Sequence, residues 1–511
     1  MENHIKEVET ISAQVKRFYD RKQRFRIYHG STSSTRQSQY RPDQVLDTSN
    51  LSHIIKVDIK QKTVLVEPNV PLDRLVETTI AHGLIPPVVM EFPGITVGGG
   101  FSGTSGESCS FRHGYFETTV VWVEIVLANG EVVTASKDVR SDLFYGAASS
   151  FGTLGVTTLL EIQLVDAKPF VELSYHPVST MSQAITRIEA ATRDETTTYI
   201  DGIFYSKDYG IIFTGKLVDT PGEGVKSQTF TRAKDPWFYL HACKKIKRHP
   251  EGVPEAIPLV DYLFRYDRGG FWVGMYAFKY FITPFNRITR WILDKFMHTR
   301  VMYHALHQSG LAKSYIVQDV GVPYAAAEEF LEFIDDTFGI YPLWLCPLRQ
   351  RRLPSISSFS LAAEKRSDAP EMLLNFGIWG PGPKDLEAFA EINRKLELKV
   401  DELGGKKCLY AHAYYTEEEF WNIYNRREYN ELRAKYHATY LPSIYDKVKV
   451  DVEGEKRRLR ESWAAWLFAI FWSIWPICGL YGVYKAVLGG DYLMPRQSRF
   501  TWKRKTETKE E

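Results

Sequence analysis

The chain has 511 residues, more than one hydrophobic core usually serves, so we expect two packed domains and an additional segment. Hydrophobic residues make up 44% of the chain and charged residues 25%, which is typical of globular proteins, whereas the aromatic share of 14% is high and suits an apolar or flat ligand. Lysine and arginine (64) nearly balance aspartate and glutamate (62), and the basic residues are scattered, so the sequence gives no support to nucleic-acid binding.

Cysteine usage and the first residues indicate the compartment. The five cysteines are Cys109, Cys243, Cys346, Cys408 and Cys478. They lie far apart and never form the CxxC pairs typical of zinc sites, so we expect a reducing compartment and no metal centre. Residues 1–25 carry charges throughout and contain no apolar stretch of signal-peptide length, so the sequence predicts no secretion signal.

Short antiparallel elements are predicted along the first third of the chain. Residues 49–71 contain two β-type runs around a polar turn, which predicts a hairpin. Residues 72–82 carry apolar side chains at helical spacing and stop at Gly83, which predicts a helix. Residues 120–136 contain an Asn-Gly turn typical of a tight hairpin, and residues 141–164 begin as a helical turn and end as a strand. We therefore expect antiparallel strands rather than βαβ units.

Residues 93–108 (PGITVGGGFSGTSGES) hold five glycines within about nine residues, a density that lets a backbone approach a ligand closely. Free amide N–H groups in such a loop could hold a pyrophosphate. The stretch from Gly98 to Gly103 satisfies GxGxxG, but the sequence predicts neither a buried parallel strand before it nor a long helix after it, so a Rossmann site is not expected. Taken alone, the motif is also compatible with a flexible surface loop.

The middle of the chain predicts a second domain after the boundary at Lys168-Pro169. Strand-like runs at 341–348 and 373–380 alternate with helix-like runs at 325–338 and 385–400, which indicates an α+β domain. We expect one domain over residues 1–168, a second over 169–450, and a separate C-terminal segment over 455–490.

The C-terminal segment contains an apolar stretch. Residues 463–484 run for about 22 residues without a charge, close to the roughly 20 needed to span a bilayer as a helix. Basic residues flank the stretch on both sides, tryptophans lie at its start and middle, and Pro476 and Gly479 would kink it. The sequence predicts a membrane segment that either spans the bilayer or lies in its interface. A buried hairpin that caps the catalytic core is the alternative.

Four strings in order, TVGGGFSGTSGES, HGYFE, VEIVLANGEVV and SDLFYGAASSFGTLGVTTLLEIQLV, resemble the FAD-binding domain of the p-cresol methylhydroxylase/vanillyl-alcohol oxidase superfamily over most of residues 1–168. The resemblance implies an α+β, two-domain FAD-binding PCMH-type fold with an α+β substrate (cap) domain. It also implies FAD contacts from Thr96, Val97, Gly98, Gly99, Gly100, Phe101, Ser102, Gly103, Thr104, Ser105, Gly106, Glu107 and Ser108, with Gly152 and Gly155 facing the flavin.

The resemblance further implies that FAD is held without a covalent bond. Members that tether FAD place a histidine just after the glycines of a first loop, for which residues 28–35 are the candidate here, or a cysteine just before the TVGG string. In this chain His29 precedes Gly30, and Gly94 and Ile95 occupy the place of the cysteine. We expect His29 and His113 to be structural.

Six segments of the second domain, residues 235–241, 257–272, 315–323, 340–348, 409–415 and 418–448, resemble the Δ24-sterol reductases. The resemblance covers nearly the whole chain up to about residue 450. It implies reduction of the C24–C25 double bond of a sterol side chain with NADPH, FAD as the hydride relay, and the endoplasmic reticulum membrane with cytoplasmic catalytic domains. Animal and plant members carry an N-terminal membrane helix, which this sequence does not predict, and the stretch 463–484 could replace it.

The implied reaction needs a proton donor, because an isolated alkene has no carbonyl to polarise. An acid would protonate C24 while hydride reaches C25. The candidate donors are Tyr410, His412, Tyr414, Tyr415 and Glu418, with Gln318 and Asp319 as second choices. Arg265, Asp267 and Arg268 form either an ion-pair cluster or a contact to the NADPH phosphate. Core aromatics that could also line the sterol slot are Tyr341, Trp344, Phe376 and Trp379.

Two alternative functions remain open from the sequence. An FAD oxidase of the aldonolactone or alditol class would use the same FAD domain, but its polar substrate fits poorly with the aromatic content and the apolar C-terminal stretch. A membrane protein that binds sterol or FAD without turnover is the second alternative. Reduction of the flavin by NADPH would separate the reductase from the oxidase, and sterol turnover would separate it from the binding protein.

Overall fold

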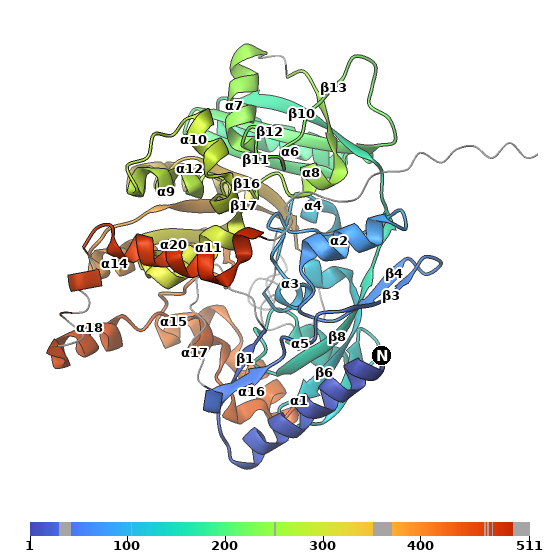
Figure 1. The fold of residues 1–511 in the computed structure, drawn as a ribbon, viewed down its shortest axis with the longest axis vertical. Helices are drawn as coiled ribbons and strands as arrows, with labels where there is room; N and C mark the ends of the chain where they lie inside the picture. Colours follow the sequence, from blue (N-terminus) through green and yellow to red (C-terminus); the bar gives the residue numbers. More distant parts are fainter. Residues whose placement is uncertain are drawn as a thin grey trace, which may run out of the picture.

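The computed structural model describes residues 1–29, 42–103, 105–249, 252–350, 370–463, 467, 470–472 and 474–493. Two bodies lie one above the other, the earlier residues forming the lower one and the middle of the chain the upper one (Figure 1). Each is built around its own β-sheet, as the length of the chain predicts. The predicted Thr104 contact and most of the candidate first FAD loop, 30–35, lie outside the described residues.

The lower body holds a five-stranded antiparallel sheet in the order β3-β4-β8-β6-β7. Its strands are β3 (Ile54–Asp58), β4 (Thr63–Val66), β6 (Val120–Leu127), β7 (Val132–Ser136) and β8 (Gly155–Gln163). The predicted hairpins β3–β4 and β6–β7 are confirmed, and Gly130, in the second turn, has a φ of 92° that favours glycine. Helix α2 (Leu72–Ile80) is confirmed as well, and Gly83 follows it with a φ of 73°.

Shorter elements complete this body. They are α1 (Glu2–Asp20), β1 (Arg26–Tyr28), β2 (Val45–Asp47), β5 (Leu84–Ile85), α3 (Val97–Gly103), α4 (Ser110–His113), α5 (Ser141–Ala147) and β9 (Val165–Asp166). Helix α1 buries Val8, Ile11 and Val15, which recur at the spacing of one helix face. The buried His4 on the same helix contacts Glu67 and Glu124, whose carboxylates raise its pKa to about 9. The N-terminal helix is therefore held to the sheet by apolar packing and an ion pair.

The upper body holds a nine-stranded sheet in the order β13-β14-β10-β12-β11-β16-β17-β15-β18. The strands are β10 (Phe170–Val178), β11 (Tyr199–Ser206), β12 (Tyr209–Val218), β13 (Lys226–Ser227), β14 (Glu255–Pro258), β15 (Tyr315–Pro323), β16 (Leu343–Arg349), β17 (Met372–Pro381) and β18 (Lys406–Lys407). Almost all neighbours pair antiparallel, β13 with β14 being the parallel exception. Strands mixed with helices confirm the predicted α+β character of this region.

Helices cover both faces of this sheet. One face packs against α6 (Met181–Arg193), α12 (Ala327–Thr337) and α14 (Leu386–Glu402), and we call it the outer face. The opposite face, which we call the inner face, packs against α7 (Phe238–Arg248), α8 (Leu259–Leu263) and α9 (Val273–Tyr280). Side chains alternate between the two faces along each strand, so the residue number decides which face a strand residue occupies.

The chain returns to the lower body after the large sheet is complete. Helices α15 (Glu417–Ile423), α16 (Arg426–Lys435) and α17 (Ile444–Val448) follow, and after α16 the rings of His437 and Tyr440 pack against Tyr19 of α1. Tyr436 and Lys435 of α16 contact Asp142 of α5, and Tyr429 donates a hydrogen bond to Thr153 at 3.0 Å. We propose that residues 426–448 belong structurally to the FAD domain rather than to a cap domain over 169–450.

The described part of the C-terminal segment differs from the prediction. Helix α18 (Val452–Glu461) precedes the apolar stretch, and helix α20 (Ile477–Gly489) begins only after a turn at 474–476, so residues 463–484 do not form one helix. Among the described residues, no helix combines the length and the apolar character that a membrane crossing needs. Helix α20 packs instead along α11 (Thr299–Ser309), where a Cβ on Gly482 would come within 2.4 Å of the Ala305 carbonyl oxygen.

Candidate active site

Residues 97–103 form the short helix α3 rather than the predicted loop. Two of its glycines, Gly98 and Gly100, pack against the protein, and two others, Gly99 and Gly103, lie on its opposite side. Gly98 and Gly100 are required by protein packing, because a Cβ on either would lie 2.7 Å from Pro68 or Met90. Gly98 also donates its N–H to the Pro68 carbonyl at 2.7 Å. Val97 and Phe101 are fully buried, and the Thr96 hydroxyl accepts the N–H of Gly99 at 3.2 Å. These residues hold α3 against the core.

Gly99 and Gly103 occupy the opposite side of the same short helix. They are one turn apart, Gly99 is exposed, and a Cβ on Gly103 would meet nothing nearer than Phe151 at 4.0 Å. A Cβ on Gly99 would lie 3.2 Å from the Thr96 hydroxyl, whereas Gly103 meets no packing demand. The absence of side chains at both positions leaves room for close approach of a ligand to the backbone. The strip of bare backbone at Gly99, Ser102 and Gly103 fits the diphosphate of FAD.

A turn at residues 149–152 closes over this helix. Ser149 and Phe151 donate their N–H groups to the carbonyls of Phe101 and Ser102 at 3.0 and 3.1 Å. Ser149, Phe151 and Gly152 all have positive φ, a conformation kept for turns and sites with a special requirement. Two segments separated by about fifty residues are thus brought side by side, as expected if both line one cofactor site.

Gly152 and Gly155 are held by protein contacts. A Cβ on Gly152 would lie 2.7 Å from Ile27, and one on Gly155 would lie 2.7 Å from the Val126 carbonyl oxygen of the neighbouring strand. The structure explains Gly155 by sheet packing, so no flavin contact is needed to account for it. Close to Gly152, Lys447 donates a hydrogen bond to the Phe151 carbonyl.

His29 lies at the edge of the same region. Its Nδ1 atom is buried and has no hydrogen-bond partner among the described residues. Burial, together with the charge of Lys447, lowers the pKa of the imidazole, so the ring is neutral near pH 7. A neutral ring with an unsatisfied buried nitrogen can hydrogen-bond to a cofactor, so His29 also fits a bound FAD.

The end of the glycine-rich stretch connects the two bodies. Glu107 and Ser108 are buried, and the Ser108 carbonyl accepts the N–H of Ile200 on β11 at 2.7 Å. A Cβ on Gly106 would lie 2.9 Å from Leu348 on β16. Direct contact of Glu107 and Ser108 with FAD, as the resemblance implies, is not favoured, because both side chains face protein.

Glu107 is part of a buried ionic network on the inner face. Arg265 contacts Glu107 at 3.7 Å and Asp201 at 2.9 Å, and Asp201 also accepts hydrogen bonds from Tyr266 at 2.5 Å and Trp344 at 3.2 Å. Burial raises the pKa of Glu107, although the charge of Arg265 opposes it. Arg265 balances two carboxylates at the domain boundary, which explains its burial.

The remaining members of the predicted basic cluster have structural partners. Asp267 accepts hydrogen bonds from His298 and Thr299, and Arg268 pairs with Asp294 at 2.7 Å. Arg268 also donates to backbone carbonyls of residues 230–235. The ion-pair interpretation is therefore confirmed, and both arginines are almost fully buried.

A second acidic cluster lies beside this network. Asp319 on β15 accepts hydrogen bonds from Asn375 at 2.9 Å and from the Tyr410 hydroxyl. Burial raises the Asp319 pKa to about 6 in spite of these donors. Burial raises the pKa of both Tyr303 and Glu91, and the nearby Asp319 carboxylate raises both further. The cluster brings together Asp319, Tyr410, Glu91, Tyr303 and Asn375.

Glu91, Tyr303 and Asn375 are members of this cluster that the sequence did not single out, and Glu91 is the acid among them. Burial and the neighbouring Glu107 carboxylate hold its pKa well above the usual range. Like Tyr303 and Tyr410, it is only half-buried, so solvent reaches these groups. Glu91 lies just before the glycine-rich stretch. A single acidic residue in a loop forms no recognisable motif, so only the fold shows which groups lie near it.

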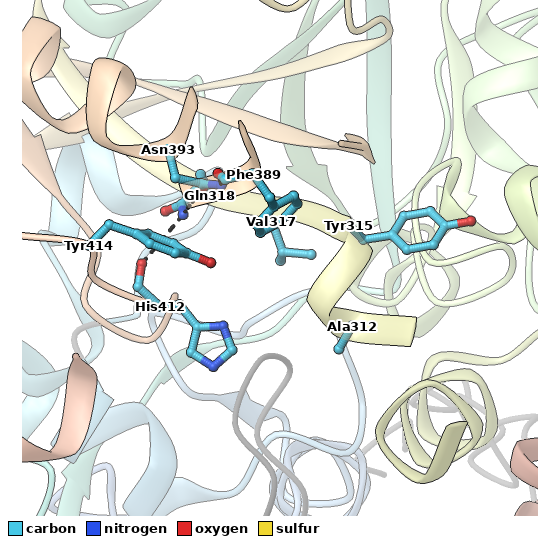
Figure 2. Close-up of a pocket in the computed structure, with 8 residues that line it drawn as sticks. All are labelled: Ala312, Tyr315, Val317, Gln318, Phe389, Asn393, His412 and Tyr414. Atoms are coloured by element: carbon cyan, nitrogen blue, oxygen red, sulfur yellow. Dashed lines mark hydrogen bonds between the residues drawn. The ribbon is translucent and has the colours of Figure 1, made fainter. Parts of the chain in front are cut away.

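Strand alternation separates the other predicted donors from Asp319. Gln318 points to the outer face, where its amide contacts Asn393 of α14 at 2.8 Å and the His412 carbonyl at 3.4 Å. Figure 2 shows His412 and Tyr414 beside Gln318, around a cavity of about 10 Å³. That volume holds about one water molecule, far less than a sterol side chain.

Tyr414, Tyr415 and Glu418 have other surroundings. The Tyr414 ring packs near Phe389, and its backbone N–H donates to Glu397 at 2.9 Å. Tyr415 is buried in the apolar cluster of α15–α17. Glu418 is exposed on the first turn of α15. Tyr410 is the predicted donor that the structure brings to the acidic cluster.

Aromatic side chains border Asp319 on the inner face. Trp379 lies 4.3 Å from Phe271 and 6.0 Å from Trp344, measured between ring centroids. Phe376 instead packs against Phe330 on the outer face, and Tyr341 contacts Asp335. Of the four predicted aromatics, Trp344 and Trp379 can therefore shield the acid from water.

Comparison with known proteins agrees with this arrangement. Residues 4–136 match the family model described as an FAD binding domain. The human Delta(24)-sterol reductase is 31% identical over 82% of this chain and 80% of its own length. The chain belongs to the Delta(24)-sterol reductase family. This family also includes the protein of Arabidopsis thaliana, 29% identical over 80% of this chain and 77% of its own length, and a homolog of Caenorhabditis elegans, 27% identical over 87% of both.

Membership in the Delta(24)-sterol reductase family confirms the resemblance found in the sequence. It also confirms the FAD-binding PCMH-type domain as the coarse architecture of the first body. More distantly, cytokinin dehydrogenase 4 of rice is 31% identical over 31% of this chain.

Proposed function

We propose that this chain reduces the C24–C25 double bond of a sterol side chain, with FAD as its bound cofactor and NADPH as the electron source. The supporting observation is the 31% identity to the human Delta(24)-sterol reductase over 82% of the chain. The bare backbone of α3 and the acidic cluster on the inner face supply sites that this chemistry needs. FAD, when bound, supplies the hydride.

Residues of α3 and the turn at 149–152 would hold the cofactor. The backbone at Gly99 and Gly103 lies open to the diphosphate, and positive charge comes from Lys447 beside Gly152. The hydrogen bonds from Ser149 and Phe151 fix the turn relative to α3. This chain therefore binds and orients the cofactor mainly through backbone rather than through side chains.

Asp319 is the proton donor in this proposal. A carboxyl with a pKa of about 6 is partly protonated near neutral pH and still acidic enough to release its proton during the reaction. Protonation of C24 leaves positive charge at the more substituted C25, which then accepts hydride. The carboxylate that forms keeps its hydrogen bonds from Asn375 and Tyr410.

Tyr410 positions Asp319. Burial and the adjacent carboxyl hold the Tyr410 pKa well above its usual range, so the hydroxyl stays protonated and keeps donating. Trp379 and Trp344 provide an apolar wall on the same face of the sheet. Exclusion of water next to the acid favours transfer of its proton to the alkene.

We infer that the protein acts at a membrane, because its proposed substrate is a membrane lipid. The endoplasmic reticulum, cytoplasmic catalytic domains and the membrane role of residues 463–484 stay predictions of this proposal. They would be tested by fractionation of cells that express the full chain.

A labelled turnover experiment tests the proposed reaction. Purified protein with FAD, NADPH and a Δ24-sterol such as desmosterol or lanosterol should give a product with a saturated side chain and unchanged ring double bonds. In deuterated water, one deuterium should appear at C24, because the Asp319 proton exchanges with solvent. Deuterium at C25 would contradict the mechanism. Oxygen consumption with unchanged sterol would contradict the function and favour an oxidase.

A further inference from the structure

A basic cleft lies in the upper body, away from the glycine-rich strip. It has a volume of about 790 Å³ and lies between α7 and α10 (Arg287–Ile292), with the β13–β14 edge beside it. Eight cationic side chains line it, of which Lys245 and Arg268 pair with Glu255 and Asp294. The other six are Lys226, Lys234, Lys244, Arg248, Arg287 and Arg290. Within the part of the chain that the structure describes, none of the six forms an ion pair.

The two acidic groups of the cleft, Glu255 and Asp235, do not cancel its positive charge. Glu255 accepts from His241 at 2.8 Å and from Lys245 at 3.1 Å. Asp235 caps its own turn by accepting the N–H of Arg232. The six unpaired cations therefore leave a net positive field in a concave space, which favours an anionic ligand.

Helix α10 adds an apolar surface to this cleft. It has no buried residue, although a capping box at Asn286 and Thr289 stabilises its start. Its apolar side chains point to solvent, with Ile288 68%, Trp291 59% and Ile292 63% exposed. Ile288 and Trp291 also line the cleft, so positive charge and exposed apolar surface meet there.

The C-terminal segment carries a further exposed apolar surface. Trp475 donates to the Tyr280 carbonyl at 2.7 Å, and the ring of Tyr492 stacks on Phe296 at 5.8 Å. These contacts tie the segment to residues that precede and follow α10 in the chain. The outward side of α20 carries further exposed apolar residues, among them Leu480 and Leu488. Large apolar patches of this kind mark interaction surfaces.

We propose that the α7–α10 cleft binds the phosphate-bearing headgroup of an anionic membrane lipid, while Ile288, Trp291 and Ile292 enter the lipid interface. Helices that lie in a membrane interface typically combine lysine and arginine with exposed tryptophan and aliphatic residues, as this surface does. Anionic headgroups are attracted by such basic clusters, each cation adding to the affinity. The proposal specifies the membrane contact inferred above and does not depend on the proposed reaction.

A lipid explains the cleft better than a free phosphate compound does. A small phosphate would use the cations but would leave the side chains of α10 exposed to water. A lipid surface uses both, because the headgroup occupies the cleft and the apolar side chains of α10 lie below it.

Vesicle flotation tests the proposal with the full-length protein. Vesicles of phosphatidylcholine with phosphatidylserine should bind it, and binding should fall with added salt. The Lys244→Glu/Arg287→Glu variant should bind these vesicles at least about tenfold more weakly, since two cations become anions. The matched control, Lys60→Glu/Lys137→Glu, reverses two exposed lysines of the FAD domain and should bind like the wild type.

Trp291→Ser tests the apolar part, with Val139→Ser as its control on the FAD domain, where Val139 is 50% exposed. Weaker vesicle binding by Trp291→Ser alone is expected. Equal binding by wild type and the cleft variants would overturn the proposal. So would equal losses in the control variants, or saturable binding of inorganic phosphate in the cleft without vesicle binding. Lys244→Glu/Arg287→Glu should reduce sterol in detergent at the wild-type rate. This measurement tests the proposed reaction separately from the proposed lipid-binding cleft.

Discussion

Asp319 and Gln318 are neighbours on one strand, and their positions decide to which face of the sheet each side chain points. Both were candidates in the sequence, and both lie on β15, but their side chains point to opposite faces of the sheet. Gln318 meets α14, whereas Asp319 meets Tyr410 and the acids near the glycine-rich strip. In the proposed mechanism, only the inner-face residue can serve as the acid.

Replacing Asp319 tests its role as the acid. Asp319→Asn keeps the size of the side chain but removes the transferable proton, so we expect kcat to fall by about 10²- to 10⁴-fold. Tyr410→Phe should cause a smaller loss, because it removes only a hydrogen bond to the acid. His412→Gln, on the outer face, is the matched control and should keep wild-type kcat.

The pH profile distinguishes an acid from a structural residue. Because burial raises the Asp319 pKa to about 6, the protonated form is present below that pH and is lost above it. Wild-type kcat should therefore decline as the pH rises through about 6, and Asp319→Asn should lack this step. An unchanged pH step in Asp319→Asn would assign the titration to another group.

At the scale of elements, α3 links the glycine pattern to the cofactor. Gly103→Glu places bulk and a negative charge on the open side of α3, where nothing in the protein is nearer than 4.0 Å. We expect this variant to fold but to purify without FAD, because the carboxylate would repel the diphosphate. Flavin absorbance per protein and circular dichroism measure the two properties separately.

Gly103→Ala is the control for that variant. A methyl group fits the open space, so the protein should keep FAD. Gly100→Val should instead damage folding, because a Cβ there would lie 2.7 Å from Met90. A yellow, FAD-loaded Gly103→Glu protein would remove this side of α3 from the cofactor site.

The elements that the sequence predicted are those with local signals. The hairpins β3–β4 and β6–β7 follow from alternation and turn residues, and α2 follows from its spacing and Gly83. The helical form of 97–103 was missed, because four glycines oppose a helix intrinsically and tertiary packing against Pro68 and Phe116 overrides that preference. For the apolar stretch 463–484 a turn at 474–476 excludes a single helix, and contacts to α11 and Tyr280 bury part of it against protein.

The site was predicted less completely than the fold. The family resemblance indicated the glycine-rich stretch and Tyr410. In the structure the former includes α3, and the latter donates a hydrogen bond to Asp319. The sequence and the family resemblance did not indicate Glu91, Tyr303 or the unpaired cations of the α7–α10 cleft. Their neighbours come from distant parts of the chain, and no local periodicity records such contacts.

On the scale of the whole molecule, a few buried contacts join the two bodies. The Ser108–Ile200 hydrogen bond, the Glu107–Arg265 pair and the packing of Gly106 on Leu348 all come from the end of the glycine-rich stretch. The segment that would hold FAD is therefore also the segment that connects the FAD domain to the large sheet. Cofactor binding should consequently stabilise more than its own domain.

We expect the purified protein to release intact FAD on acid precipitation and to be stabilised when FAD is added back. The positions used for covalent attachment in the superfamily are not matched here, since Gly94 and Ile95 precede the TVGG string.

A ligand that binds only the folded state at about 100 times its Kd adds about 2.7 kcal/mol to the free energy of unfolding. Scanning calorimetry of FAD-free protein, titrated with FAD, should show Tm rising with FAD concentration in the transition that includes the large sheet. Riboflavin, which lacks the diphosphate, is the control ligand and should raise Tm far less. Flavin retained on the acid-precipitated protein would show a covalent bond, and a Tm shift limited to a separate FAD-domain transition would show that the two bodies unfold independently.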